Sequence, residues 1–171
     1  MATYKGIKGF TVQSLATDPV PSSAAWSSGG NMNTARSQLA GAGTQTAGIV
    51  FAGDTGGASD SVDTELYNGS SWTEVNNLNT ARAALSASGS STLAIAFGGD
   101  VPPKTGKTES WNGTSWTEVN DLSTSRSGMS QGGGTSGSAT GTFAAAGYTT
   151  TAVTTVEEWT VDAAVATVTT S

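Results

Sequence analysis

One stretch of 15 residues occurs twice in this sequence. Residues 68–82 read N-G-S-S-W-T-E-V-N-N-L-N-T-A-R and residues 112–126 read N-G-T-S-W-T-E-V-N-D-L-S-T-S-R, so 11 of the 15 positions are identical. Recurrence at a fixed spacing is the signature of a fold in which one supersecondary unit is stacked several times. The duplication therefore predicts a repeat protein.

The repeat extends beyond this stretch in four registers. Tryptophans spaced by 46 and 44 residues are each followed ten residues later by one of the chain's three arginines, and three glutamates each stand two residues before an aromatic. The tryptophans are Trp26, Trp72 and Trp116, the arginines Arg36, Arg82 and Arg126, the glutamates Glu65, Glu109 and Glu157, and the following aromatics Tyr67, Trp111 and Trp159. Apolar runs that end at glycine recur as G-I-V-F-A-G-D (48–54), A-I-A-F-G-G-D (94–100) and T-F-A-A-A-G-Y (142–148). One unit is therefore built three times.

Each unit is predicted to hold four short strands, because none of its segments has a helical period. The expected first strands are 37–43, 83–89 and 127–133, the second strands are the apolar runs, the third are 64–67 and 108–111, and the fourth are 71–75 and 115–119. Asn68-Gly69 and Asn112-Gly113 favour the left-handed backbone of a tight hairpin turn, so the third and fourth strands form a hairpin.

A four-stranded antiparallel unit of 44 to 48 residues, with small residues in its first strand and aromatics in the later ones, is suited to a wedge around an axis. Wedges of this kind form β-propellers, so we expect three propeller blades. The predicted blade core consists of Trp26, Trp72, Trp116, Tyr67, Trp111, Trp159, Phe51 and Phe97.

The order of apolar run, glycine pair, long loop, Glu-x-aromatic, Trp and Asn-Thr-Ala-Arg resembles the kelch repeat over roughly residues 26–160. The pattern departs at Ala52-Gly53 and Ala146-Gly147, where the second unit has Gly98-Gly99. This resemblance implies an all-β, kelch-like propeller.

The N-terminal sequence M-A-T-Y-K-G-I-K-G-F-T-V-Q-S-L resembles the opening of virion structural proteins from marine tailed bacteriophages, where it precedes kelch-like arrays. That resemblance implies a virion protein, assembled in the host cytoplasm, such as a tail fibre or capsid decoration. Residues 1–20, with Lys5, Lys8 and Phe10, would dock onto a tail or capsid component, and the array would contribute to host attachment.

We expect a docking segment at 1–25, blades at 26–160 and a C-terminal extension at 161–171, either an extra strand or a frayed end. Where the last unit should have a fourth-strand tryptophan, five residues after Trp159, stands Ala164. The strand at Trp26 could supply the missing piece. Closed propellers have about 4 to 8 blades, so three blades leave edges that a homodimer, a homotrimer or a larger shell would cover.

The repeated arginines allow two interpretations. They could form a cradle for carboxylates or sulfated sugars, since guanidinium groups bind such anions through two parallel hydrogen bonds. Alternatively, each arginine pairs with the in-register glutamate of its unit and bridges strands. We favour the structural interpretation, because repeated positions usually serve the packing of the repeat.

Other chemistry has weaker support. The chain has no Cys and no His, and its net charge of −6 argues against nucleic acid as a partner. No segment is long and apolar enough for membrane insertion. Asp54, Asp60, Asp63 and Asp100 could offer oxygen ligands to Ca²⁺, but their spacing matches no calcium loop. We therefore expect no cofactor, no metal and no catalytic site.

Two functions are compatible with the sequence. The first is the virion structural protein described above. The alternative is a receptor- or glycan-binding propeller that is not part of a virion, with a binding face made by residues 54–63, 100–107 and 147–154. Its partner would be a host surface glycan or receptor.

Overall fold

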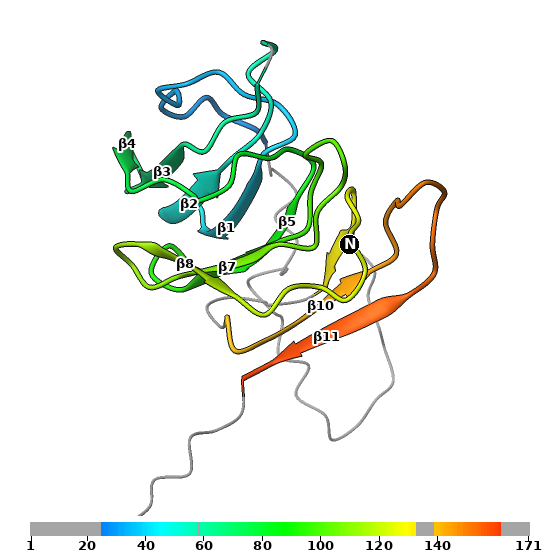
Figure 1. Ribbon diagram of the computed structural model, residues 1–171. Coiled ribbons are helices and arrows are strands. Elements are labelled where there is room, and N and C mark those ends of the chain that lie inside the picture. Colours follow the sequence, from blue (N-terminus) through cyan, green and yellow to red (C-terminus); the bar gives the residue numbers. More distant parts are fainter. Residues whose placement is uncertain (1–24, 58, 133–138, 162–171) are drawn as a thin grey trace, which may run out of the picture.

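The computed structural model describes residues 25–57, 59–132 and 139–161. The predicted docking residues Lys5, Lys8 and Phe10 and the extension after residue 161 lie outside the described residues. Within them the regular structure is entirely β, with eleven strands in three antiparallel sheets and no helix (Figure 1). The predicted all-β class is confirmed.

The first sheet has the order β1-β2-β3-β4, which is also the order of the chain. Its strands are β1 (Ala40–Thr44), β2 (Ala47–Phe51), β3 (Thr64–Tyr67) and β4 (Trp72–Val75). Phe51 lies opposite Ala40 on β1 and Thr64 on β3, and Tyr67 lies opposite Trp72. These strands are the four that the sequence predicts for one unit.

The second sheet repeats the first, with the order β5-β6-β7-β8. Its strands are β5 (Ser86–Gly89), β6 (Ala94–Phe97), β7 (Thr108–Trp111) and β8 (Trp116–Val119). Phe97 lies opposite Ser86 and Thr108, and Trp111 lies opposite Trp116, so the pairing register is that of the first sheet.

The third sheet has three strands among the described residues, in the order β11-β10-β9. They are β9 (Ser130–Gly132), β10 (Gly141–Ala145) and β11 (Val156–Thr160). Trp159 lies opposite Thr142, and Glu157 lies opposite Ala144. The outer strand β11 thus corresponds to β3 and β7.

The first strands of successive sheets lie next to one another. The strand β5 contacts both β1 and β9, so the second sheet lies between the first and the third (Figure 1). Equivalent backbone hydrogen bonds join successive units: the Gly53 amide donates to the Arg82 carbonyl and the Gly99 amide donates to the Arg126 carbonyl, each at 2.9 Å. Each unit is therefore attached to the next by the same contact.

The core consists of layers between the sheets. Between the first two sheets, the Phe51 and Trp116 rings meet edge to face with their centroids 4.6 Å apart, and Trp111 is completely buried. Alanines at Ala87 and Ala94 let the backbones approach closely around these rings. The second layer, between the second and third sheets, contains Ile95, Phe97, Met129 and Ala144, with Trp159 packed against it.

The turn after the second strand is the same in all three units. Gly98 has a φ of 63°, and its equivalents Ala52 and Ala146 have φ of 60° and 56°. An L-residue with a side chain pays about 1 kcal/mol or more in this left-handed region. The turn is therefore preserved even where alanine stands in place of the first glycine of the Gly98-Gly99 pair.

The third and fourth strands form hairpins, as the Asn-Gly pairs predict. Four residues, Asn68 to Ser71, connect β3 to β4, and only Gly69 has a positive φ, of 92°. The Asn68 side-chain oxygen accepts hydrogen bonds from the amides of Ser70 and Ser71, each at 2.9 Å. The asparagine therefore contributes through its side chain, and the left-handed residue is the glycine.

Trp26 is not a core residue, which corrects the prediction from its register. Its relative exposure is 104%, and no strand occurs in residues 25–39. The scheme in which its strand completes the third unit of the same chain is also wrong for the described residues, since residues 25–30 lie against the first sheet. Tyr67, Trp72 and Trp159 are partly buried, whereas the other predicted core residues, Trp111, Trp116, Phe51 and Phe97, are buried.

Candidate functional site

Each arginine pairs with the glutamate that the repeat assigns to it. Arg36 and Glu65 approach to 2.7 Å, Arg82 and Glu109 to 2.7 Å, and Arg126 and Glu157 to 2.9 Å. All three arginine side chains have no exposed surface, and neither do the side chains of Glu65 and Glu109. We call these contacts the Arg–Glu pairs.

The arginines of the outer units also bind backbone carbonyls where the second and third strands meet the long loop. Arg36 donates from Nη1 to the carbonyls of Ala52 and Asp63, at 2.9 and 2.6 Å. Arg126 makes the equivalent bonds to the carbonyls of Ala146 and Thr155, at 3.3 and 2.9 Å. One guanidinium thus satisfies carbonyls from both ends of the loop and holds its base closed.

The glutamates are fixed from the opposite side by the start of the unit. Glu65 Oε2 accepts from the Asn33 amide at 2.7 Å and from Asn33 Nδ2 at 2.9 Å, and Glu109 accepts from the same two groups of Asn79, both at 2.8 Å. Each asparagine also donates from Nδ2 to the carbonyl of the fourth-strand tryptophan at 3.3 Å. In the third unit, the Ser123 amide donates to Glu157 at 2.7 Å.

These asparagines were missed as site residues by the sequence reasoning. The signal was present, because Asn33 and Asn79 each stand three residues before the arginine of their unit. Ser123 holds the same position in the third unit and keeps the backbone bond. The site in each unit is therefore a triad of asparagine or serine, arginine and glutamate.

Hydrogen bonding determines the ionisation of Glu65 and Glu157. Burial alone would raise the pKa of Glu65, but the donors of Asn33, Arg36 and Thr34 outweigh it and lower that pKa below its ordinary value. The pKa of Glu157 is also lowered: burial opposes the shift, and the Ser123 donors and the charge of Arg126 produce it. Both carboxylates are therefore held in the charged form.

Burial has the opposite effect on the arginine of the second unit. It lowers the pKa of the Arg82 guanidinium, against the attraction of Glu109. Arg82 Nη1 donates to Glu109, while Nε and Nη2 have no partner among the described residues. The middle arginine therefore depends on its glutamate more than Arg36 and Arg126 do.

The loops after the second strands gather at one end of the sheets. Lys104 approaches Asp100 Oδ2 at 3.4 Å and lies 5.2 Å from the centroid of the Tyr148 ring, so loops of the second and third units touch. Burial, together with the charges of Asp54 and Asp100, raises the pKa of Asp60. Three carboxylates, a cation and a ring thus share this end.

The four aspartates that were weighed as calcium ligands, Asp54, Asp60, Asp63 and Asp100, do not form a metal site in the described part of the chain, where no group of three or more acidic side chains could hold an ion. Asp54 Oδ1 accepts from the Gly56 amide at 2.6 Å, and the Asp63 carboxylate lies 3.4 Å from Asn77 Nδ2. Asp100 is paired with Lys104. These carboxylates therefore have local partners in the loops.

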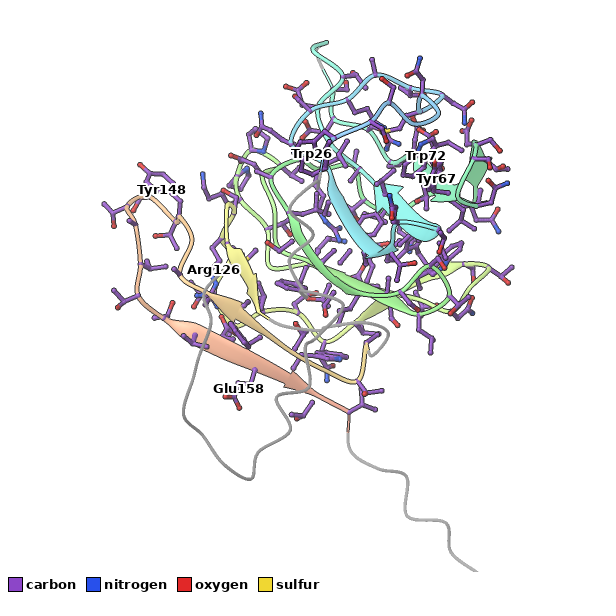
Figure 2. All side chains as sticks on the ribbon, turned by 180° about the vertical axis from the view of Figure 1, so that it is seen from behind. Trp26, Tyr67, Trp72, Arg126, Tyr148 and Glu158 are labelled. Carbon is purple, nitrogen blue, oxygen red and sulfur yellow. The ribbon has the colours of Figure 1, made fainter. Side chains whose placement is uncertain are left out.

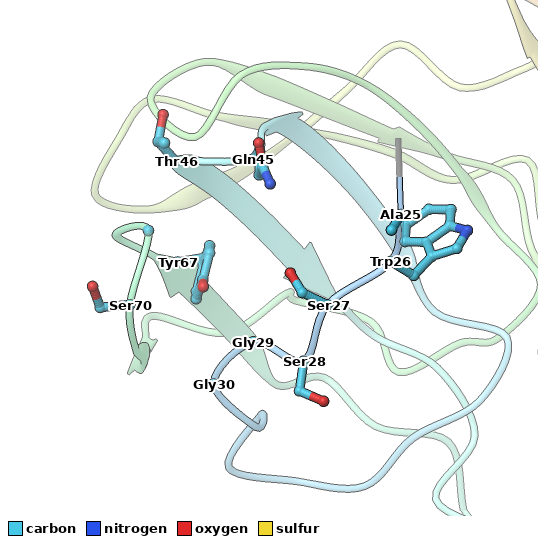
Figure 3. Close-up of a pocket in the computed structure, with 11 residues that line it drawn as sticks. Ala25, Trp26, Ser27, Ser28, Gly29, Gly30, Gln45, Thr46, Tyr67 and Ser70 are labelled. Carbon is cyan, nitrogen blue, oxygen red and sulfur yellow. The ribbon is translucent and has the colours of Figure 1, made fainter. Parts of the chain in front are cut away.

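A groove lies at the opposite end of the first sheet. It has a volume of about 970 Å³, and Figure 3 shows residues 25–30 on one side and Gln45, Thr46, Tyr67 and Ser70 on the other. A second hollow of about 510 Å³ continues over the outer face of the sheet to Val50 and Trp72. Within the described residues, the outer face of the first sheet is therefore not covered by another sheet.

No protein-family model and no curated protein matches the chain. No helix that could cross a bilayer occurs in residues 25–57, 59–132 and 139–161.

Proposed function

We propose that this chain is a bacteriophage virion structural protein. Its three units would form kelch-like propeller blades, anchored by residues 1–20 to a tail or capsid component and contributing to host attachment. The observation that carries the proposal is that the repeated charges are used inside each unit: the arginine of every Arg–Glu pair is buried, and those of the first and third units hold strand ends together. The resemblance of the N-terminal sequence to phage virion proteins is the reason for placing the protein in the virion.

A propeller arrangement is supported by the way the units follow one another. The second sheet presents one face to the first sheet and the other to the third, and the first strands lie side by side. Small residues in β5 and β6, such as Ala87 and Ala96, keep this inner region narrow, while Trp111 and Trp116 widen the outer part. That taper is what a blade around an axis requires.

The test is incorporation into particles. A phage that encodes this chain would be complemented with either the full-length protein or a variant without residues 1–20, and purified particles would be analysed by mass spectrometry. We expect the full-length protein in the particles and the truncated one only in the unassembled fraction. Equal melting temperatures of the two purified proteins would show that the truncation leaves the array folded.

Two outcomes would contradict the proposal. The full-length chain could be absent from the particles, in which case it is not a virion component. The truncated chain could be incorporated as efficiently as the intact one, in which case residues 1–20 do not anchor it. A triple substitution of Lys5, Lys8 and Phe10 by alanine is the finer version of the same test.

A second candidate is a receptor- or glycan-binding module outside a virion. The observation that favours it is the contact between Lys104, Asp100 and Tyr148 at the loop end, since a cation, carboxylates and an aromatic ring together can bind a polar ligand such as a sugar. Glycan-array binding that is lost in Tyr148→Ala and kept without residues 1–20 would support it. Absence of binding to any glycan or host-cell surface would reject it.

A further inference from the structure

Among the described residues, the third sheet has no strand at the position where the second sheet carries β8 and its tryptophan. In the second unit, Trp116 on β8 packs on Phe51 of the first sheet and donates from Nε1 to Thr64 Oγ1 at 3.1 Å. The corresponding residues one unit later are Phe97 and Thr108. Both line a cavity of about 60 Å³ between the second and third sheets, and Trp159 is another of its walls.

A fourth strand on the outer edge of β11 would place a tryptophan at this cavity. Trp111 on β7 lies opposite Trp116 on β8, and Trp159 is the counterpart of Trp111. Thr108 Oγ1 donates to the Gly106 carbonyl and retains its capacity to accept a hydrogen bond. The cavity thus offers the same ring and the same acceptor that Trp116 uses.

Trp26 is the chain's remaining tryptophan in this register, and it is fully exposed. The residues after it already occupy the place of a fourth strand in front of the first sheet. Gly30 lies against the Ser70 carbonyl, and its carbonyl accepts a hydrogen bond from Trp72 Nε1 at 3.1 Å. One unit later, the counterpart of Gly30 is Asn76, which donates to the carbonyl of Thr114, the counterpart of Ser70. Residues 26–30 therefore lie where an additional sheet would present its outer strand.

That additional sheet is not the third sheet of the same chain. The second sheet lies between the first and the third, and Tyr67 and Trp72 lie at one end of the array while Glu158 lies at the other (Figure 2). The position can be filled by the third sheet of another molecule.

We propose that two copies of this chain join head to tail through this position. Trp26 of each copy packs over the opening of the cavity beside Phe97 and Thr108 of the other, and residues 26–29 pair with the edge of β11 that has no partner strand among the described residues. Two such contacts close two arrays of three sheets into a ring of six, which is within the about 4 to 8 blades of closed propellers. The inference rests on the geometry of the repeats and is independent of a role in virions.

The backbone contacts between units lead to the same partner. The Gly53 and Gly99 amides donate to the arginine carbonyls of the following units. At the ends of the array, the Gly147 amide and the Arg36 carbonyl, which hold the corresponding positions, have no backbone partner within the described residues. A second copy placed head to tail brings this donor and this acceptor together.

The outer face of the third sheet also matches a buried face. Phe143 occupies the strand position of Ile49 and Ile95, which are 0% and 1% exposed, but Phe143 itself is 41% exposed. On the first sheet, Tyr67 and Trp72 form an open aromatic surface with ring centroids 4.8 Å apart. The head-to-tail contact covers both surfaces with each other.

Engineered cysteines test the register directly, because the chain has no cysteine of its own. Ser110 lies opposite Thr117 in the second sheet, so the proposal places Glu158 opposite Ser27 of the other copy. Full-length Ser27→Cys and Glu158→Cys proteins would be mixed and oxidised, so that a mixed disulfide joins two chains. The matched control is Thr117→Cys mixed with Glu158→Cys, since Thr117 has the same repeat position as Ser27 and is exposed.

We expect a disulfide-linked dimer from the first mixture and not from the control. In sedimentation equilibrium, we expect Trp26→Ala to weaken the dimer by at least about 30-fold, the fold-change of an interface hot spot. Circular dichroism should be unchanged, because Trp26 is fully exposed within one chain. No cross-link, or equal cross-linking in both mixtures, would overturn the proposal. An intrachain disulfide at monomer mass in the Ser27→Cys/Glu158→Cys double variant would also overturn it.

Discussion

Replacing Arg82 with methionine removes the cation from the most deeply buried Arg–Glu pair. Both side chains of this pair have no exposed surface, and their charged atoms lie 2.7 Å apart. Removing one partner of a buried pair costs about 3 to 5 kcal/mol, because the other charge stays buried without compensation. Glu109 keeps two hydrogen bonds from Asn79, each of 2.8 Å, so we expect the lower part of that range.

The assay is thermal unfolding followed by circular dichroism. For a chain of this length, about 1 kcal/mol corresponds to about 2 to 4 °C, so Arg82→Met should lower the melting temperature by about 6 to 12 °C. Adding Glu109→Gln removes the stranded charge, and we expect the double variant to recover about 1 to 3 kcal/mol. Lys107→Met is the control, because the Lys107–Glu118 pair is 37% and 50% exposed and should contribute at most about 1 kcal/mol.

Two results would refute this reasoning. A decrease of less than about 2 °C for Arg82→Met would mean that the pair does not stabilise the unit. A double variant less stable than Arg82→Met would mean that the buried carboxylate is not the source of the cost. If the arginines served a ligand, Arg82→Met would instead lower binding and leave the melting temperature unchanged.

Three further perturbations follow from the same structure. Trp116→Ala should cost about 3 to 5 kcal/mol in unfolding free energy, and Trp72→Ala less, because Trp72 is only partly buried; equal costs would contradict the burial argument. Because the pKa of Glu65 is lowered in the folded protein, the ionised carboxylate stabilises the fold above pH 4.5, the ordinary pKa, and this stabilisation is lost as the pH falls below that value. The melting temperature should therefore decrease below pH 4.5, and less steeply in Glu65→Gln than in the original protein. Parallel pH profiles of the two proteins would reject this. Ala146→Gly should raise stability by about 1 kcal/mol in denaturant unfolding, because glycine relieves a φ of 56° at an exposed position, and a loss of stability would show that the turn is not strained.

The strands and the Arg–Glu pairs could be predicted from the sequence because the repeat places each residue relative to the others. A residue found in register three times is expected to have the same neighbours three times, so the register alone indicated that the three arginines pair with the three glutamates. The first strands begin later than predicted, at Ala40 and Ser86, because Ser37 and Ala83 form isolated bridges to the loop residues Asp54 and Asp100. The repeat therefore predicts which residues are equivalent between units more accurately than it predicts where each strand begins.

Trp26 shows where this reasoning failed. Its register with Trp72 and Trp116 is real, but a fourth-strand tryptophan is buried only if its strand pairs within one sheet and a neighbouring sheet packs against its ring. The register does not show which molecule provides these two sheets. The positive φ of Ala52 and Ala146 could not be predicted from residue propensities either, because alanine disfavours this conformation. Only the equivalence of these alanines to Gly98 indicates it.

The open faces at the two ends of the array are tested most directly by the mass of the full-length protein in solution. If two head-to-tail arrays close into a ring as proposed, multi-angle light scattering across a range of concentrations should give about twice the chain mass of 17.0 kDa. Trp26→Ala should shift that mass toward a single chain. A mass of one chain at every concentration would contradict the proposal that a second copy completes the fold.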